Sequence, residues 1–310
     1  MLAILKTTDT GLARLEQFEP GSWIDLVSPT EEELERVSRE LNIPLDFLKG
    51  PLDEEEKSRI DIEDGLTQVI VDIPILVREG DQQGYNTIPL GMLIHPDYFI
   101  TTCLRPNPIL GEFERNTVRG FTTYYKTRFL FQILKQVSVF YLKYLGRIDR
   151  ETDRIERALR ASMRNEEFFD LLGLHKSLVY FTTSLRANEA VLQKLLRTKT
   201  VKMYEEDEEL LEDVIIENKQ ASEMAKIYTD ILTGMMDAFS SVISNNLNQV
   251  MKFLTSVTIL LSIPTIVASF YGMNVKLPFQ EYQHAFLLTC VIWLIISGAF
   301  AIIFWKKRYL

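Results

Sequence analysis

Residues 253–275 read FLTSVTILLSIPTIVASFYGMNV, and none of these 23 residues is charged. A second uncharged run, residues 285–305, reads AFLLTCVIWLIISGAFAIIFW. A helix needs about 20 apolar residues to cross a hydrocarbon core about 30 Å thick, so each run is long enough to span a membrane. Two buried core helices are the weaker interpretation, because residues 285–305 are apolar on every face. The sequence therefore predicts a multi-pass protein of the lipid bilayer, with transmembrane helices over 251–273 and 285–305.

Charge is divided unevenly around these runs. Residues 1–252 contain 30 Lys and Arg against 42 Asp and Glu, and residues 253–310 contain 4 against 1. The net charge of −9 is thus a −12 segment followed by a +3 segment. A basic tail, residues 306–310, follows the second span, whereas the loop 274–284 holds one Lys and one Glu. By the positive-inside rule we expect both termini in the cytosol, the loop outside the cell, and a plasma-membrane location.

The remaining composition argues against several functional classes. A net charge of −9 disfavours a nucleic-acid partner, since phosphate neutralisation needs clustered Lys and Arg. Cys103 and Cys290 form no C-x-x-C pair, so neither a cysteine-built zinc site nor a disulfide framework is expected. The chain has no phosphate-binding loop, dinucleotide fingerprint or nucleophile elbow, and only three histidines. We therefore expect no enzyme and no prosthetic group.

The first 120 residues predict a cytosolic domain of mixed helices and strands. β-Branched and aromatic residues broken by Gly, Pro and Asp predict strands over residues 2–6, 23–27, 66–77 and 87–104. Between the second and third of these, Ser28 to Glu31 forms a capping box that opens a helix through Glu40. The expected fold class is an α+β cytosolic domain followed by long helices and two C-terminal transmembrane helices.

Long helices are predicted from residue 121 to residue 250. One apolar seam consists of Leu130, Leu134, Val137, Tyr141, Tyr144, Ile148 and, after a break at Glu151, Ile155. A second helix over 166–198 has an apolar stripe of Leu171, Leu174, Leu178, Phe181, Leu185 and Leu192. Residues 204–219 are strongly acidic. These acids either form a solvated helix start or bind divalent cations, and charge alone does not decide between the two.

A polar stripe follows the long helix after residue 207 into the first span. We call the following twelve positions, spaced four and three residues apart, the polar seam: Asp230, Gly234, Asp237, Ser241, Ser244, Asn248, Met251, Thr255, Thr258, Ser262, Thr265 and Ser269. Lipid favours an apolar surface, so a polar stripe must face water or another helix. Close packing of small residues is one explanation of the part within the membrane.

Packing explains less well why the polar seam continues outside the membrane through Asn248, Asp237 and Asp230. The alternative is a pore, and two spans from one chain cannot enclose one. A pore therefore requires a symmetric ring of identical chains, with the first span inside and the apolar second span against lipid. Asp230 and Asp237 are the only charges on the polar seam, so its hydroxyl and amide oxygens would carry a cation.

The end of the first span carries the sequence Tyr271-Gly272-Met273-Asn274. Together with the short loop, the second span and the basic tail, it resembles the CorA family of divalent-cation channels, whose signature is Gly-Met-Asn at this position. The resemblance covers the whole chain. It implies a funnel-like homopentamer that conducts magnesium, with some members handling cobalt, nickel or zinc.

The resemblance also implies roles for individual residues. Gly272, Met273 and Asn274 would form the selectivity filter at the outer mouth; a helix-capping role for Asn274 is the alternative, and Gly272 suits a close approach or a left-handed backbone. The polar seam supplies the pore lining over Asn248, Met251, Thr255, Thr258, Ser262, Thr265 and Ser269. Family members often have a larger apolar residue near Ser262, so we expect any constriction at Met251 and neighbouring Leu254, although Met251 also suits bundle packing.

Closure by cytosolic magnesium is a further implication of the resemblance. By position, Asp213 matches an acidic partner of the regulatory site between subunits, and Asp237 an acidic pore residue. The residue that supplies the opposing carboxylate is not identified, and the candidates are Asp72, Glu79 and Asp81. In the outer loop, Lys276 counts against a loop that concentrates cations, and Glu281 counts for it.

The leading hypothesis is thus a magnesium channel, with magnesium as cargo and regulatory ligand. A zinc, cobalt or nickel transporter of the same fold is the close alternative; the absence of His and Cys from the polar seam argues against a path of soft ligands. A membrane-anchored sensor or scaffold without transport is the alternative of another class, and it leaves the Gly-Met-Asn motif and the polar seam unexplained.

Overall fold

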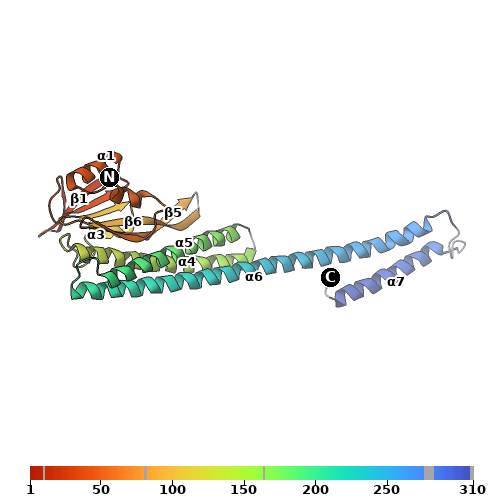
Figure 1. Cartoon of the computed structure of the whole chain (residues 1–310). Helices are drawn as coiled ribbons and strands as arrows, with labels where there is room; N and C mark the ends of the chain where they lie inside the picture. Colours follow the sequence, from red (N-terminus) through yellow and green to blue (C-terminus); the bar gives the residue numbers. More distant parts are fainter. Residues whose placement is uncertain (10, 80–81, 163–164, 276–282, 308–310) are drawn as a thin grey trace. The chain divides into compact units, whose positions relative to one another are not determined.

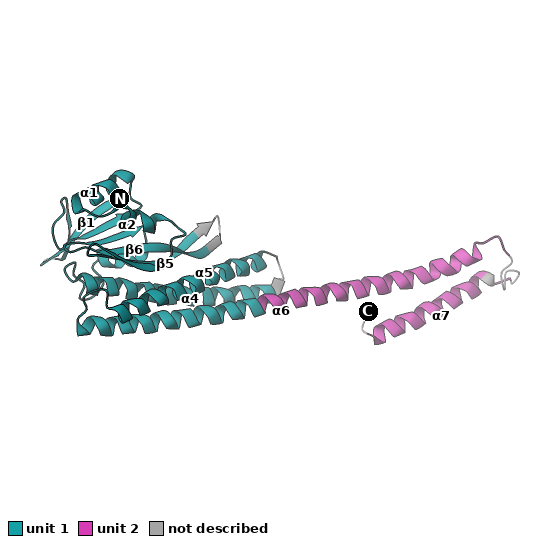
Figure 2. Cartoon of the chain, viewed as in Figure 1, with its two compact units in different colours: residues 1–234 teal, residues 235–310 magenta. Residues whose placement is uncertain are grey.

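The structure is a computed structural model that describes the chain except for residues 10, 80–81, 163–164, 276–282 and 308–310. It divides into two compact units, residues 1–234 and 235–310, which are described separately (Figure 2). In chain order the elements are β1 (Leu2–Thr8), β2 (Gly11–Leu15), β3 (Trp23–Val27), α1 (Glu31–Leu41), α2 (Leu45–Lys49), η1 (Gly50–Leu52), β4 (Arg59–Glu63), β5 (Leu66–Glu79), β6 (Gln82–Ile94), β7 (Phe99–Cys103), α3 (Pro108–Glu114), α4 (Lys126–Ser162), α5 (Asn165–Thr198), α6 (Glu205–Tyr271) and α7 (Ala285–Lys306) (Figure 1).

Seven strands form one sheet in the order β2-β1-β3-β7-β6-β5-β4. Only the pairing of β3 with β7 is parallel among these described strands. The strand predicted over 23–27 is confirmed, and those over 2–6 and 66–77 lie within β1 and β5. The single strand predicted over 87–104 is wrong. It is divided into β6 and β7 by a turn containing Pro96, where His95 N donates to Tyr98 O over 3.0 Å.

The N-cap of helix α1 lies two residues later than predicted. Thr30 is the N-cap: its hydroxyl accepts from Glu33 N over 3.3 Å, and Thr30 N donates to the Glu33 carboxylate over 3.0 Å. The capping box is therefore Thr30 with Glu33, and the prediction of Ser28 with Glu31 is wrong. Ser28 has a left-handed backbone, with φ of 45°, which takes it out of the capping geometry.

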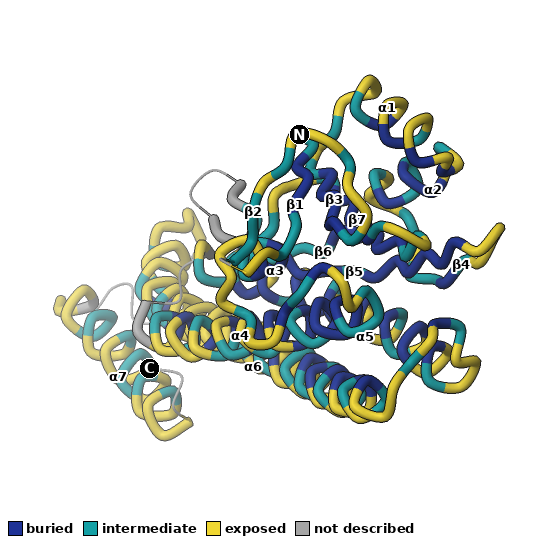
Figure 3. The backbone as a smooth tube through the Cα atoms, turned by 90° about the vertical axis from the view of Figure 1, so that its left-hand side faces the viewer, coloured by how far each residue is buried: buried dark blue, intermediate teal, exposed yellow. Residues whose placement is uncertain are grey.

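The sheet of unit 1 lies between two layers of helix (Figure 3). Helices α1 and α2 cover one face through a core that includes Ile24, Val37 and Leu48. Helices α4 and α5 cover the other face. There Trp23 stacks edge-on against Phe129, with 5.2 Å between ring centroids. This α+β arrangement confirms the predicted fold class for the first part of the chain.

The predicted apolar stripes of α4 and α5 are confirmed, because every predicted position is buried. On α4 the stripe continues past Glu151 through Thr152 and Leu159, so the expected break is only partial. The predicted boundary at residue 120 lies in the loop before α4, whose first residue is Lys126. Sheet, α4, α5 and the beginning of α6 nevertheless belong to one compact unit.

The side chain of Asn188, on α5, hydrogen-bonds the backbone of β5 beyond the end of its pairing with β4. Strand β4 pairs with β5 only as far as Ile70, which leaves the backbone of Asp72 facing an open edge. The Asn188 carboxamide accepts from Asp72 N over 2.9 Å and donates to Asp72 O over 2.8 Å. Tyr141 also donates to Asp72 O, over 3.0 Å. The backbone N–H and carbonyl of Asp72 are therefore paired with side chains of α4 and α5, as buried backbone groups must be paired.

Helix α6 runs without a break from unit 1 into unit 2, with Pro264 inside it. Its first part buries apolar or small side chains in unit 1, namely Leu211, Val214, Ala221, Ala225 and Leu232. In unit 2, α7 returns beside its last part (Figure 1). Helix α6 and residues 286–306 of α7 are long and apolar enough to cross a membrane by length and composition. The predicted limits of the spans stay predictions, although α6 ends at Tyr271 and α7 begins at Ala285, close to them.

Candidate functional site

The part of α6 in unit 2 has two distinct faces. Ser256 and Ile263 are the buried residues of α6 in this unit, and α7 is the helix that lies beside this part of α6 (Figure 1). Thr258 and Thr265 each come two residues later, and two residues correspond to about 200° around a helix. All twelve residues of the polar seam are exposed in the single chain. The polar seam thus lies on the side of α6 that faces away from the second span.

Three hydroxyl groups of the polar seam within the predicted first span share one orientation. Thr258 Oγ1 donates to Leu254 O over 2.8 Å, and Ser262 Oγ donates to Thr258 O over 2.8 Å. Thr265 Oγ1 donates to Leu261 O over 3.3 Å. Each hydroxyl hydrogen is therefore used inside the helix, and the oxygen lone pairs are left to accept from outside. Such a surface suits a cation or the water around it, since it offers acceptors and no positive charge.

Met251 and Leu254 mark the beginning of the apolar part of α6. Both side chains are exposed in the single chain, and Met251 lies on the polar seam itself. Leu254 comes three residues later, about 60° away around the helix, and so lies at the edge of the polar seam. In a ring of copies these two side chains would give the polar seam its first apolar section. Their role as a constriction stays a prediction.

The Gly-Met-Asn motif directly follows the last residue of α6. Gly272 N donates to Ala268 O over 2.9 Å and Met273 N to Phe270 O over 3.2 Å, which closes the helix end. A Cβ on Gly272 would lie 3.4 Å from Ala268 O, an ordinary contact, so the close approach expected there stays a prediction. The left-handed alternative is wrong, because Gly272 has no positive φ. Among the described contacts, the Asn274 side chain makes no hydrogen bond to α6, which disfavours the capping role.

The two predicted regulatory acids lie in different units. Asp213, in unit 1, is mostly exposed, and its Oδ2 lies 3.6 Å from Lys135 Nζ of α4. The same Nζ lies 3.9 Å from Glu217 Oε1. Asp237, in unit 2, is exposed on the polar seam. The described residues contain no group of three or more His, Cys, Asp or Glu that could hold a metal ion.

Sequence reasoning missed Lys135. It follows Leu134 of the buried seam and gives no signal of its own, because its acidic partners are 78 and 82 residues away in the chain. Only the packing of α4 against α6 brings the ammonium group to these carboxylates. Burial raises the pKa of the Glu217 carboxyl, and Lys135 opposes that shift. Lys135 therefore competes with any cation at Asp213 and Glu217.

Asp72 is poorly placed as the opposing carboxylate of a site between subunits. It lies beneath α5, and burial raises the pKa of its carboxyl, partly offset by a hydrogen bond from Ser184. A carboxyl covered by its own chain is not available to a neighbouring copy. Other parts of the chain discussed above lie outside the described residues: Asp81, Lys276, Glu281, residues 308–310 of the basic tail and the side chain of Glu79.

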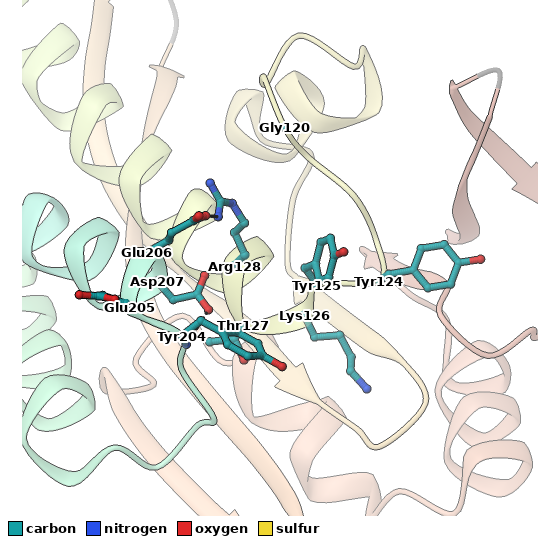
Figure 4. Close-up of a pocket in the computed structure, with 10 residues that line it drawn as sticks. All are labelled: Gly120, Tyr124, Tyr125, Lys126, Thr127, Arg128, Tyr204, Glu205, Glu206 and Asp207. Atoms are coloured by element: carbon teal, nitrogen blue, oxygen red, sulfur yellow. Dashed lines mark hydrogen bonds and ion pairs between the residues drawn. The ribbon is translucent and has the colours of Figure 1, made fainter.

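A cavity of about 950 Å³ lies between the beginnings of α4 and α6 in unit 1 (Figure 4). Its basic groups are engaged by the chain itself. Arg128 NH1 lies 2.8 Å from Glu206 Oε2, and Lys126 Nζ donates to His95 O over 2.8 Å and to Pro96 O. We assign no ligand to this cavity, so the polar seam and the motif at its end form the candidate site.

Comparisons with known proteins match nearly the whole chain. The family model described as "CorA-like Mg2+ transporter protein" matches residues 19–308. The cobalt/magnesium transport protein CorA of Methanocaldococcus jannaschii is 30% identical over 302 residues, which cover 93% of this chain and 91% of that protein. A magnesium transport protein CorA of Campylobacter jejuni is 23% identical over 313 residues, covering 92% and 90% of the two chains.

Solved structures agree with the sequence comparison. The complete structure of the CorA magnesium transporter from Methanocaldococcus jannaschii matches with a TM-score of 0.86 and 27% identity, and covers 100% of this chain and 99% of that one. The full-length CmaX protein, at 16% identity and a TM-score of 0.73, shares the fold alone; 99% of this chain and 97% of that one are covered. The family model and the M. jannaschii relative both span nearly the whole sequence, and the chain therefore belongs to the CorA family.

Proposed function

We propose that this chain is the subunit of a homopentameric magnesium channel in the plasma membrane, with both termini in the cytosol. The observation that carries the proposal is the polar seam: it presents oxygen acceptors on the side of α6 away from α7 and leads to Gly272-Met273-Asn274. In a symmetric ring this side would face the axis, and α7 would face lipid. We infer magnesium as the cargo because the family description and the name of the M. jannaschii relative both include it.

Transport would proceed with the ion's water shell largely retained. Magnesium gives up its waters reluctantly, so neutral groups that hydrogen-bond the shell capture the ion without stripping it. Asn274 would provide such groups at the mouth, and Thr265, Ser262 and Thr258 would accept from the shell along the path. A doubly charged ion gains about 5 kcal/mol per 100 mV of membrane potential, which is enough to drive inward flow.

Closure would follow from cytosolic magnesium bound by acids of neighbouring subunits, with Asp213 as one ligand and Asp237 acting in the pore. Bound ions would hold like-charged subunits together, and their loss would let the carboxylates repel each other. Lys135 lies within 4 Å of Asp213 and so would weaken the regulatory site. It would thereby set the magnesium concentration at which the channel closes.

Cobalt, nickel or zinc transport is the alternative within the same fold. The name of the M. jannaschii relative includes cobalt. The polar seam has no His or Cys, the ligands that favour zinc and nickel over magnesium. A sensor or scaffold without transport is not favoured, because the relatives are named as transport proteins.

A flux assay in reconstituted vesicles tests the proposal. We expect magnesium uptake by the wild type and at least a tenfold loss in Asn274→Ala, because the mouth then lacks its amide. Asn246→Ala is the matched control: Asn246 comes two residues before Asn248, about 200° around α6 from the polar seam, and its uptake should stay within twofold of wild type. Equal background uptake in wild type and Asn274→Ala contradicts the channel. Uptake of zinc without magnesium favours the alternative cargo.

A further inference from the structure

Pro264 leaves one backbone carbonyl of α6 without its usual partner. Proline has no N–H, so the carbonyl of Leu260, four residues earlier, loses the hydrogen bond that a helix would otherwise give it. Within a hydrocarbon core no water is available to replace that bond, and an unsatisfied backbone group costs several kcal/mol. A group on a neighbouring element is therefore needed to satisfy the Leu260 carbonyl.

The free carbonyl lies on the face of α6 that α7 covers. Leu260 is half-buried and lies between the buried residues Ser256 and Ile263 along one stripe. Helix carbonyls point along the axis towards the residue four positions later, here Pro264, which is also half-buried. The Leu260 oxygen is thus directed along the interface with α7 and away from the polar seam.

The opposite helix carries a hydroxyl group that also has no partner. Ser297 belongs to the half-buried stripe of α7, with Trp293 and Ala301 on either side. Among the buried polar side-chain atoms described in unit 2, Ser297 Oγ is the one without a hydrogen-bond partner. Thr258 and Ser262 of α6, in contrast, each donate to a carbonyl of their own helix.

The Leu260 carbonyl and the Ser297 hydroxyl lie at the same depth. Helix α6 ends at Tyr271 and α7 begins at Ala285, next to the same loop. Leu260 comes 11 residues before that end and Ser297 comes 12 residues after that beginning, which at about 1.5 Å per residue is about 17 Å and about 18 Å. Because the helices are antiparallel, the carbonyl that loses its N–H partner and the hydroxyl without an acceptor lie at about the same level.

We propose that Ser297 Oγ donates a hydrogen bond to the Leu260 carbonyl, and that this bond links the second span to the first at its proline. Ser297 Oγ has no hydrogen-bond partner in the conformation described here, so the bond belongs to a second arrangement of the spans. Rotation of the Ser297 side chain and bending of α6 at Pro264 lead to that arrangement. The bond does not rest on the proposed function, whereas its effect on transport does.

A double-mutant cycle on the full-length protein in detergent tests the bond. Ser297→Ala should lower the midpoint of thermal unfolding by about 2–4 °C, and Ser297→Thr, which keeps a hydroxyl, should lower it less. Pro264→Ala supplies an N–H to the Leu260 carbonyl, so adding Ser297→Ala to that variant should cost less than about 1 °C. Thr183→Ala is the control: it removes a hydroxyl that donates to Val179 O on the exposed side of α5, and its effect should be the same in the wild-type and Pro264→Ala backgrounds.

Two outcomes overturn the proposal. An equal cost of Ser297→Ala with and without Pro264→Ala means that the hydroxyl binds another group. No cost in either background means that Ser297 forms no bond that matters for stability. If the bond exists and the protein transports magnesium, Ser297→Ala should also change the uptake rate by about two- to fivefold. Absence of uptake in the wild type would contradict the proposed function and leave the thermal cycle valid.

Discussion

The two parts of α6 form one continuous helix in two different surroundings. In unit 1, Leu211 is fully buried against the chain's own helices, with 0% of its surface exposed. In unit 2, Leu247 is 62% exposed, and its apolar neighbours Val250 and Leu254 are exposed as well. The first part is therefore stabilised by contacts within the chain, whereas the second part requires lipid or other copies of the chain to cover it.

The two units also differ in where they hold charged side chains. Unit 1 holds a buried carboxyl, Asp25, in its core, whereas residues 253–275 of unit 2 contain no charged side chain. Trp23 Nε1 donates to Thr101 Oγ1 over 2.8 Å, and Thr101 Oγ1 donates to Asp25 Oδ1 over 2.6 Å. The effect of pH on stability should therefore arise mainly in unit 1.

Replacing Asp25 should have the largest effect. Burial raises the pKa of Asp25 to about 7, although the hydrogen bond from Thr101 opposes the shift. The pKa of an unfolded aspartate is about 3.9, so the folded chain binds this proton more tightly and its stability falls as pH rises from about 4 to about 7. A shift of about three units corresponds to about 4 kcal/mol. Asp25→Asn should thus be more stable than wild type at pH 8 by up to about that amount, and nearly equal to it at pH 4.

Denaturant unfolding followed by tryptophan fluorescence, in a Trp293→Phe and Trp305→Phe background that leaves Trp23 as the one tryptophan, measures this effect at the network itself. Asp46→Asn is the matched control, since Asp46 is exposed on α2. Its unfolding free energy should follow that of wild type at every pH. If wild type and Asp25→Asn lost stability equally between pH 5 and pH 8, the pH dependence would belong to another group.

A pair of leucine substitutions tests the comparison directly. Leu211→Ala should lower the free energy of unfolding of unit 1 by about 3 kcal/mol, because a fully buried side chain leaves a cavity. Leu247→Ala should change that quantity by less than about 0.5 kcal/mol, because the single chain leaves this side chain exposed. Urea unfolding of the detergent-solubilised protein measures both. Equal losses would mean that other copies of the chain bury Leu247 in the solubilised protein.

Much of the fold could be predicted from the sequence because periodicity reports burial. The apolar stripes of α4 and α5 and the two uncharged runs are patterns within one segment, and the structure confirms them as buried stripes and as long apolar helices. The division of residues 87–104 into β6 and β7 was missed because both strands are rich in β-branched residues and only the turn around Pro96 separates them.

The candidate site likewise has features that the sequence predicts and contacts that it does not. The polar seam and the Gly-Met-Asn motif could be found because they lie on a single helix and its end. Lys135 beside Asp213 and Asn188 beside Asp72 could not be found, because each pair joins distant segments through side chains that have no pattern of their own. Contacts between elements depend on packing, which local periodicity does not encode.

The smallest expected effect concerns Lys135, whose ammonium group would compete with a cation for the acids beside it. Lys135→Met keeps the aliphatic length and removes the charge 3.6 Å from Asp213 Oδ2 and 3.9 Å from Glu217 Oε1. An exposed pair of this kind contributes about 0.2–1 kcal/mol. Under the proposed regulation, the cytosolic magnesium concentration that halves the current should fall by about two- to fivefold.

Patch recordings at graded cytosolic magnesium measure this shift. Lys219→Met provides the control, because Lys219 is exposed on another side of α6, and its inhibition curve should match wild type. Adding Asp213→Asn to Lys135→Met should reverse the shift, since the carboxylate released by the lysine is then lost as well. If Lys135→Met left the inhibition curve unchanged, Asp213 would have no role in regulation. A shift that persists without the Asp213 carboxylate would assign the ion to Glu217, and the regulatory site would then lie one turn further along α6.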